Sequence, residues 1–244
     1  MNAARPHLLN YQWLAISYFV FSAVGFSLFL AFGYTYTKSG DKLKSLSHLI
    51  TATSAIEALF SVFLALHGLL AMLYYALLLK YCDRVPNWAA YLISVCIFIF
   101  TLLTGVFATL PYDNAHFAFA TLAFASTAIA GALIVWTCQA NPLGWKAIGV
   151  KAAIVISGCL LVVFAILAHV STAKNEGPLE WTSIYLLTFV GLALYFIVRD
   201  ENEAKACADA KAELKAGAKA GAEATAKAGA GAVIEMRPLS KFRV

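Results

Sequence analysis

Charged residues are scarce in this chain. Only 13% of its 244 residues are charged, 61% are hydrophobic, and the mean hydropathy is +0.77. A soluble domain carries about a quarter charged residues, because its surface has to be hydrated. The composition therefore excludes a soluble globular enzyme and indicates a protein that lies in a membrane.

Proline is absent from the long apolar runs, and all six prolines fall between or beyond them. Each run has about 20 residues or more, which matches roughly 30 Å of hydrocarbon crossed by an α-helix. Strands of a membrane barrel would instead alternate over about ten residues. The predicted fold class is all-α: a polytopic membrane protein whose residues 1–200 form a six-transmembrane-helix bundle. The spans are expected at about residues 12–34, 50–79, 88–110, 115–138, 147–170 and 180–198.

Large apolar side chains are also almost absent from the C-terminal part of the chain. Residues 201–244 form a low-complexity tail rich in alanine, lysine and glycine, which has too little apolar surface to build a core. Alanine favours helix and glycine opposes it, so we expect a helical extension that frays near Gly217 and then disorder. Lys211, Lys215 and Lys219 would share one helix face. These lysines would contact anionic lipid head groups or a cytosolic protein partner. The alternative is that the tail is a solvated spacer.

Recognisable catalytic and metal-binding motifs are missing as well. The chain has no His-Glu-x-x-His and no Gly-x-Ser-x-Gly sequence, which are the spacings of zinc-dependent and serine hydrolases. A b-type haem needs two histidines from neighbouring spans at one depth, and the sequence pattern offers His67 no such partner. We therefore predict no catalytic residue, no metal and no cofactor. Nothing in the sequence indicates a nucleic-acid partner.

A few ionisable residues lie inside or at the edge of the predicted spans. With six spans, the loops after spans one, three and five open on the same side, so these residues share the outer membrane surface. Charge within hydrocarbon is costly, and such residues usually face the bundle interior. Three interpretations stay open: a structural carboxylate–histidine pair, a pocket for a lipid head group or small solute, and catalysis or metal binding. The candidate residues are Glu57, Asp113, His116, His169, Glu180 and the adjacent Trp181.

Several short motifs open the later spans. Asn87-Trp88 opens the third, Asp113-Asn114-Ala115-His116 the fourth, and Glu180-Trp181-Thr182 the sixth. In this order they resemble the FRAG/DRAM/SFK family, which includes the damage-regulated autophagy modulators. The family has an acidic residue at the outer end of span two, a histidine opening span four and a Glu-Trp pair at span six. Glu57, His116 and Glu180-Trp181 fall in those places. The first outer loop is shorter here than in many members and lacks their proline-glutamate motif.

The resemblance implies a six-helix protein of the endomembrane system, in lysosome or Golgi, or of the plasma membrane, with both termini in the cytosol. Relatives are linked to autophagy control, to lipid-kinase scaffolding and to remodelling of glycosylphosphatidylinositol anchors. We expect a non-enzymatic regulator or scaffold that binds membrane lipid at the outer polar residues. The alternative is a lipid or glycosylphosphatidylinositol-anchor remodelling factor that uses the same residues. The sequence does not decide the oligomeric state.

Basic residues divide unevenly between the two sides of the predicted bundle, and lysine and arginine favour the cytosolic side. The larger group lies on the side of the two termini, which places both of them in the cytosol. This group comprises Arg5, Lys80, Arg84, Lys146, Lys151 and Arg199, and the opposite group Lys38, Lys42, Lys44 and Lys174.

This topology predicts that position 42 and the tail lie on opposite sides of the membrane. In a variant whose five cysteines are replaced by alanine, Lys42→Cys should react with a membrane-impermeant maleimide only from outside. Ala216→Cys should react only after the cytosolic side is opened. Labelling of both positions from the same side of sealed vesicles would contradict the six-span map.

Overall fold

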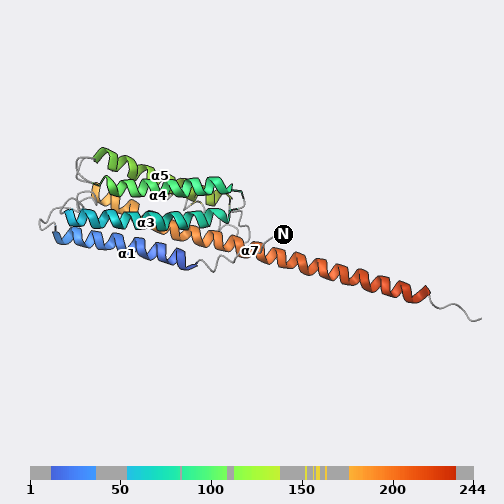
Figure 1. Cartoon of the computed structure of the whole chain (residues 1–244). Coiled ribbons are helices and arrows are strands. Elements are labelled where there is room, and N and C mark those ends of the chain that lie inside the picture. Colours follow the sequence, from blue (N-terminus) through green and yellow to red (C-terminus); the bar gives the residue numbers. More distant parts are fainter. Residues whose placement is uncertain are drawn as a thin grey trace, which may run out of the picture. The chain divides into compact units, whose positions relative to one another are not determined.

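The computed structural model describes residues 12–36, 54–82, 84–108, 113–137 and 176–234, together with positions 152, 156, 158, 159 and 163. Within these residues every regular element is a helix and there is no strand, as predicted. Figure 1 shows them along the chain. They are α1 (Gln12–Tyr36), α3 (Ser54–Lys80), α4 (Asn87–Val106), α5 (Asp113–Thr137) and α7 (Glu176–Ile234).

Five helices are long and apolar enough to cross a bilayer, so the chain is an integral membrane protein. Their outward faces are apolar too: on α1, Ile16, Val20, Val24 and Leu28 are all exposed and recur every four residues. Such a stripe would be unfavourable in water and is suited to lipid. The fifth predicted span, 147–170, lies outside the described residues except for the isolated helical positions. One of these, Gly158, lies near Ala128 of α5.

Tryptophans mark the ends of the apolar helices. Trp13, Trp88 and Trp136 are exposed within two residues of a helix end, where an amphipathic ring meets the membrane–water interface. Trp181 differs, because its side chain is only 3% exposed and packs in a cluster with Phe26, Phe60 and other apolar residues.

Residues 1–202 and 203–244 form two separate compact units. The α7 helix continues past Gly217 to Ile234, so the expected fraying near Gly217 is wrong. A glycine costs a helix interior about 1 kcal/mol relative to alanine, and the many alanines around Gly217 and Gly221 offset this cost. The residues after Ile234, where disorder was expected, lie outside the described residues.

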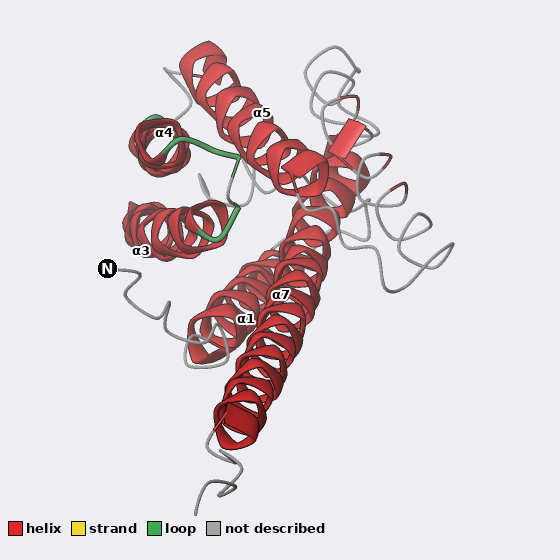
Figure 2. Ribbon diagram, turned by 90° about the vertical axis from the view of Figure 1, so that its right-hand side faces the viewer, coloured by secondary structure: helices red, strands yellow, loops and turns green. Residues whose placement is uncertain are grey.

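Within the first unit the helices lie side by side as a bundle. Figures 1 and 2 show α3 between α1 and α4, and α5 beside α4, from where it also contacts α3. The first part of α7 lies along α1, where the hydroxyls of Ser27 and Tyr185 are 2.8 Å apart in a hydrogen bond. It also meets α3, because the Tyr74 hydroxyl donates a hydrogen bond to the carbonyl oxygen of Gly191.

The contact between α3 and α4 depends on small residues. The buried residues of α4 recur every three or four positions and form one stripe: Ala90, Ser94, Ile97, Thr101 and Gly105. At Gly105 a Cβ atom would lie 3.3 Å from the Cα atom of Ser61. The Ser61 hydroxyl donates a 2.8 Å hydrogen bond to the Gly105 carbonyl oxygen. Small residues let membrane helices approach closely enough for such bonds.

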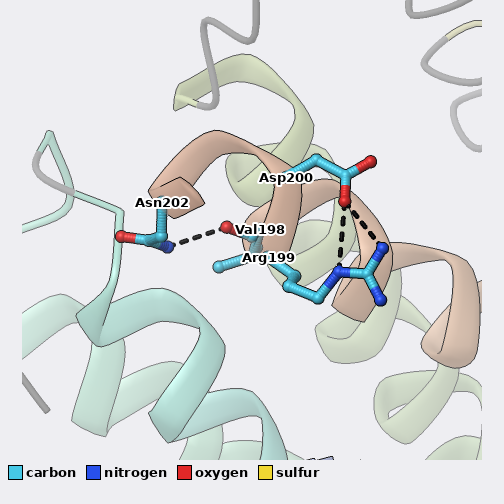
Figure 3. A network of polar contacts seen from close by, with 4 residues as sticks. All are labelled: Val198, Arg199, Asp200 and Asn202. Carbon is cyan, nitrogen blue, oxygen red and sulfur yellow. Dashed lines mark hydrogen bonds and ion pairs between the residues drawn. The ribbon is translucent and has the colours of Figure 1, made fainter. Parts of the chain in front are cut away.

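A change from apolar to polar residues marks the end of the bundle part of α7 (Figure 3). Arg199 pairs with Asp200 at 2.9 Å, and its guanidinium lies 5.1 Å from the centre of the Phe196 ring. The Asn202 amide donates a 2.7 Å hydrogen bond to the carbonyl oxygen of Val198. This polar turn follows the buried Leu194, Tyr195 and Val198, so the charged heads stay beside the apolar core rather than in it.

An aromatic cluster joins α1 to α3 around Phe63. Its ring centre lies 4.9 Å from that of Phe26 and 5.3 Å from that of Phe29. The ring also covers Gly25, where an added Cβ would lie 2.1 Å from the nearest Phe63 carbon. Since neighbouring rings hold Phe63 in place, this glycine is required by packing.

We therefore expect Gly25→Ala to destabilise the protein by about 1–3 kcal/mol, the typical cost of overpacking a core. Gly131→Ala is the matched control, because the nearest atom to its Cβ, on Leu194, is 3.5 Å away. The measurement is unfolding in mild detergent by titration with a denaturing detergent. Equal unfolding midpoints for the two variants would show that the Phe63 ring moves aside without cost, and would contradict this prediction.

Candidate functional site

The first unit contains a partly open cavity lined by residues from all five helices described. Its volume of about 80 Å³ exceeds the roughly 10–15 Å³ that one water needs. Its lining is mostly apolar and aromatic. The apolar lining residues are Phe26, Phe60, Leu64, Ala71, Ile97, Ala120, Ala123, Phe124, Ile184 and Leu187, and the polar ones are Tyr18, His67, Thr101, Thr104, His116, Thr127 and Thr188.

Three of the cavity threonines use their hydroxyls inside their own helices. Thr104 donates to the Phe100 carbonyl oxygen at 2.7 Å, Thr127 to that of Ala123 at 2.9 Å, and Thr188 to that of Ile184 at 3.0 Å. Bonds of this type, made to the carbonyl four residues earlier, satisfy a hydroxyl where no water is present. These three residues therefore add little free hydrogen-bonding capacity to the cavity.

His116 closes the C-terminal end of α4 from its neighbour α5. Its side chain is buried, and Nδ1 lies 2.9 Å from the carbonyl oxygen of Thr104. A carbonyl oxygen can only accept, so Nδ1 carries the proton and donates. In the neutral ring Nε2 is then the accepting nitrogen.

Two more carbonyls of this helix end are also bonded. The last carbonyls of a helix have no partner within it. Phe107 N–H donates to the Leu103 oxygen at 2.9 Å, and Ala108 N–H to the Gly105 oxygen at 3.3 Å. With His116 on Thr104, the carbonyls of Leu103, Thr104 and Gly105 all have partners.

His67 is the buried polar residue of the cavity wall whose sealed ring nitrogen has no hydrogen bond. It lies near the middle of α3 and is only 7% exposed. Aromatic rings surround its imidazole, with centres at 5.6 Å for Tyr18, 5.3 Å for Phe26 and 5.9 Å for Phe63. Within the described part of the chain its side chain has no hydrogen bond, and Nδ1 is sealed from solvent.

Thr101 of α4 lies beside this part of α3. Its Cβ would be 3.1 Å from a Cβ added to Gly68, the residue after His67. Unlike the other cavity threonines on α4, α5 and α7, Thr101 makes no side-chain hydrogen bond among the described residues. His67 and Thr101 are thus two polar side chains without partners on one cavity wall.

The two histidines lie at different heights in the cavity. His67 is next to Gly68, which faces Thr101, whereas His116 bonds to Thr104. Three residues of helix correspond to an offset of about 4.5 Å. Among the described residues no three His, Cys, Asp or Glu side chains come together as a metal site requires.

The structure accounts for three of the predicted outer residues. His116 lines the cavity. Trp181 is buried beside it among aromatic residues. Glu57, in the first turn of α3, is half-buried, does not line the cavity and makes no polar contact within the described ranges.

The structure does not describe the side chains of the other predicted residues. Asp113 and Glu180 lie in helices, but their side chains are outside the described part of the chain. His169 is outside it altogether. The convergence of Glu57, His116 and Glu180 therefore stays a prediction.

Sequence reasoning considered His67 only as a haem ligand and did not consider Thr101. A usable signal was present, because Phe60, Leu64, His67 and Ala71 follow helical spacing on one face of α3. A histidine on such a face has to find a partner or a ligand.

No protein-family model, no curated protein and no solved structure matches this chain. The function is therefore argued from the cavity and the bundle.

The His116 cap gives a direct test of these bonds. His116→Phe keeps a ring of similar size but leaves the Thr104 carbonyl unsatisfied, which should cost about 1–3 kcal/mol of stability. Thr104→Val is the control, since it keeps the carbonyl and removes only the hydroxyl. The measurement is the same detergent unfolding titration. A His116→Phe protein as stable as Thr104→Val would contradict the capping role.

Proposed function

We propose that this protein is a non-enzymatic integral membrane regulator or scaffold that takes one end of a membrane lipid into its helix bundle. The observation that carries the proposal is the cavity in the first unit, which five helices line and whose wall is largely apolar. Ligand sites in proteins are typically apolar cavities with a few polar groups that orient the ligand. Because the surrounding medium is lipid, a lipid is the ligand most available to such a site.

The lining argues for binding rather than catalysis. Of the residues that line the cavity, only histidines and one tyrosine titrate, and none is a serine, cysteine, carboxylate, lysine or arginine. Nucleophilic catalysis needs a nucleophile beside a base. The described wall offers no serine or cysteine nucleophile, and the threonine hydroxyls of Thr104, Thr127 and Thr188 are already bonded within their own helices.

The finer parts of the proposal concern topology and location. The chain would cross the membrane six times, with residues 147–170 as the fifth span and both termini in the cytosol. It would act in the lysosome, the Golgi or the plasma membrane, as the resemblance to the FRAG/DRAM/SFK family implies. The helix of residues 203–226 is almost entirely exposed, which suits a tail that meets anionic lipid heads or docks a cytosolic partner.

A second candidate function is lipid or glycosylphosphatidylinositol-anchor remodelling by the outer polar residues. One observation favours it. His116 lines the cavity, and histidine is the side chain most often used in general acid–base catalysis. Lipidomics of a knockout separates the two functions. If His116→Ala or Glu57→Gln restores localisation but not lipid composition, the regulator is excluded.

Occupancy of the cavity tests the lead proposal. Ala123→Phe places a large side chain in the cavity and should reduce cross-linking by a photoactivatable, clickable lipid about tenfold, because the ligand loses its space. Ala132→Phe on the exposed side of the same helix is the control and should label like the natural protein. Unchanged labelling of a folded Ala123→Phe protein would contradict the proposal.

A further inference from the structure

We infer that the cavity takes the hydroxyl-bearing end of a neutral lipid, and that His67 and Thr101 bind that hydroxyl. The inference rests on the proposed function, since it requires a lipid in the bundle. It adds the chemical class of the lipid and the residues that select it.

Neutrality follows from the lining. No lysine or arginine is among the described residues of the cavity wall, so a phosphate or carboxylate buried against them would have no counter-charge. Burial of an unpaired charge in an apolar site is strongly unfavourable. The described wall therefore favours an uncharged group over an anionic head group.

The need for a hydrogen-bonding group follows from His67. Its imidazole is buried and has no hydrogen bond in the described part of the chain. A buried polar group without a partner is costly, and native proteins rarely keep one. A neutral imidazole has one donor nitrogen and one acceptor nitrogen. Rotation of the ring by half a turn exchanges the positions of its nitrogen and carbon atoms, so either nitrogen can be turned toward a ligand. The ligand that completes the site therefore carries a group that hydrogen-bonds to imidazole.

Thr101 identifies that group as a hydroxyl. Its own hydroxyl is the second unpartnered group on the wall, across the close contact of α3 and α4 at Gly68. A ligand hydroxyl donates one hydrogen bond and accepts others, so it can bridge the imidazole and the threonine. The apolar remainder of the wall, including Phe60, Leu64 and Phe124, then contacts hydrocarbon. Water alone would leave this apolar part unmatched, because a buried water needs two to four polar partners.

Two sources can supply such a lipid: a sterol and a diacylglycerol. The protein is expressed full-length in cells and labelled in separate arms with photoactivatable, clickable cholesterol, diacylglycerol and phosphatidylserine probes. We expect labelling of peptides from α3, α4 or α5 by cholesterol or by diacylglycerol, with the stronger of the two naming the source. Phosphatidylserine as the strongest probe at these peptides would overturn the inference.

The threonines supply a matched pair of variants. Thr101→Val and Thr188→Val make the same substitution in the same cavity, but only Thr188 bonds within its own helix. Loss of one ligand hydrogen bond should reduce labelling about threefold to tenfold in Thr101→Val. Thr188→Val and the hydroxyl-retaining Thr101→Ser should label like the natural protein. Equal labelling of folded Thr101→Val and Thr188→Val would refute the role of Thr101.

His67→Phe keeps an aromatic ring in place and should lower labelling by a similar factor. Its detergent unfolding midpoint serves as the folding check, and the midpoint should not fall, because an unpartnered polar group is removed.

The Ala123→Phe variant separates the two proposals. If it abolishes labelling while Thr101→Val and His67→Phe label normally, the cavity holds a lipid but the hydroxyl contact is wrong. If Ala123→Phe labels normally as well, both proposals fall.

Discussion

Inside a bilayer no water is available to a polar group, so each one has to find its partner within the protein. Most of the described bundle follows from this constraint. Near the end of α4, the carbonyls of Leu103, Thr104 and Gly105 accept hydrogen bonds from His116, from Ser61 and from the N–H groups of the next residues. Tyr74 bonds in the same way to the α7 backbone at Gly191.

These bonds require close contact between helices, and the small residues provide it. A Cβ at Gly105 would crowd α3, and a Cβ at Gly25 would displace the Phe63 ring. At the α3–α4 contact, glycine allows the close approach that the hydrogen bond requires. Most described polar groups there have partners, but the side chains of His67 and Thr101 do not. On a hydrated surface such unbonded groups would be ordinary, whereas in an apolar cavity they indicate a missing ligand.

The helical, membrane-spanning character of the chain could be predicted from the sequence, because length and apolar content decide it. Trp13, Trp88 and Trp136 are exposed near helix ends, where an amphipathic ring prefers to lie. Trp181 is buried instead, because aromatic neighbours from α1 and α3 cover it. The helix past Gly217 was also missed, because the alanines around the glycines favour helix more strongly than the expected fraying allowed for.

The candidate site was harder to predict. His116 was singled out, but its partner is a backbone carbonyl of α4, and backbone partners leave no trace in a sequence. Thr101 and Thr188 differ in how the side chain is rotated on similar helices. The sequence does not show this rotation, so the two threonines could not be distinguished from it. Lining by five helices is a property of their packing, which hydrophobic periodicity alone does not specify.

The central claim is that the bundle is completed by a lipid whose hydroxyl reaches His67 and Thr101. The most direct measurement is a high-resolution cryo-electron microscopy map of the full chain in lipid nanodiscs, with a bound antibody fragment to aid alignment. The account predicts elongated non-protein density in the cavity that ends within hydrogen-bonding distance, about 3 Å, of the Thr101 hydroxyl and the His67 ring. A cavity filled by the protein's own side chains, with His67 bonded to one of them, would contradict it.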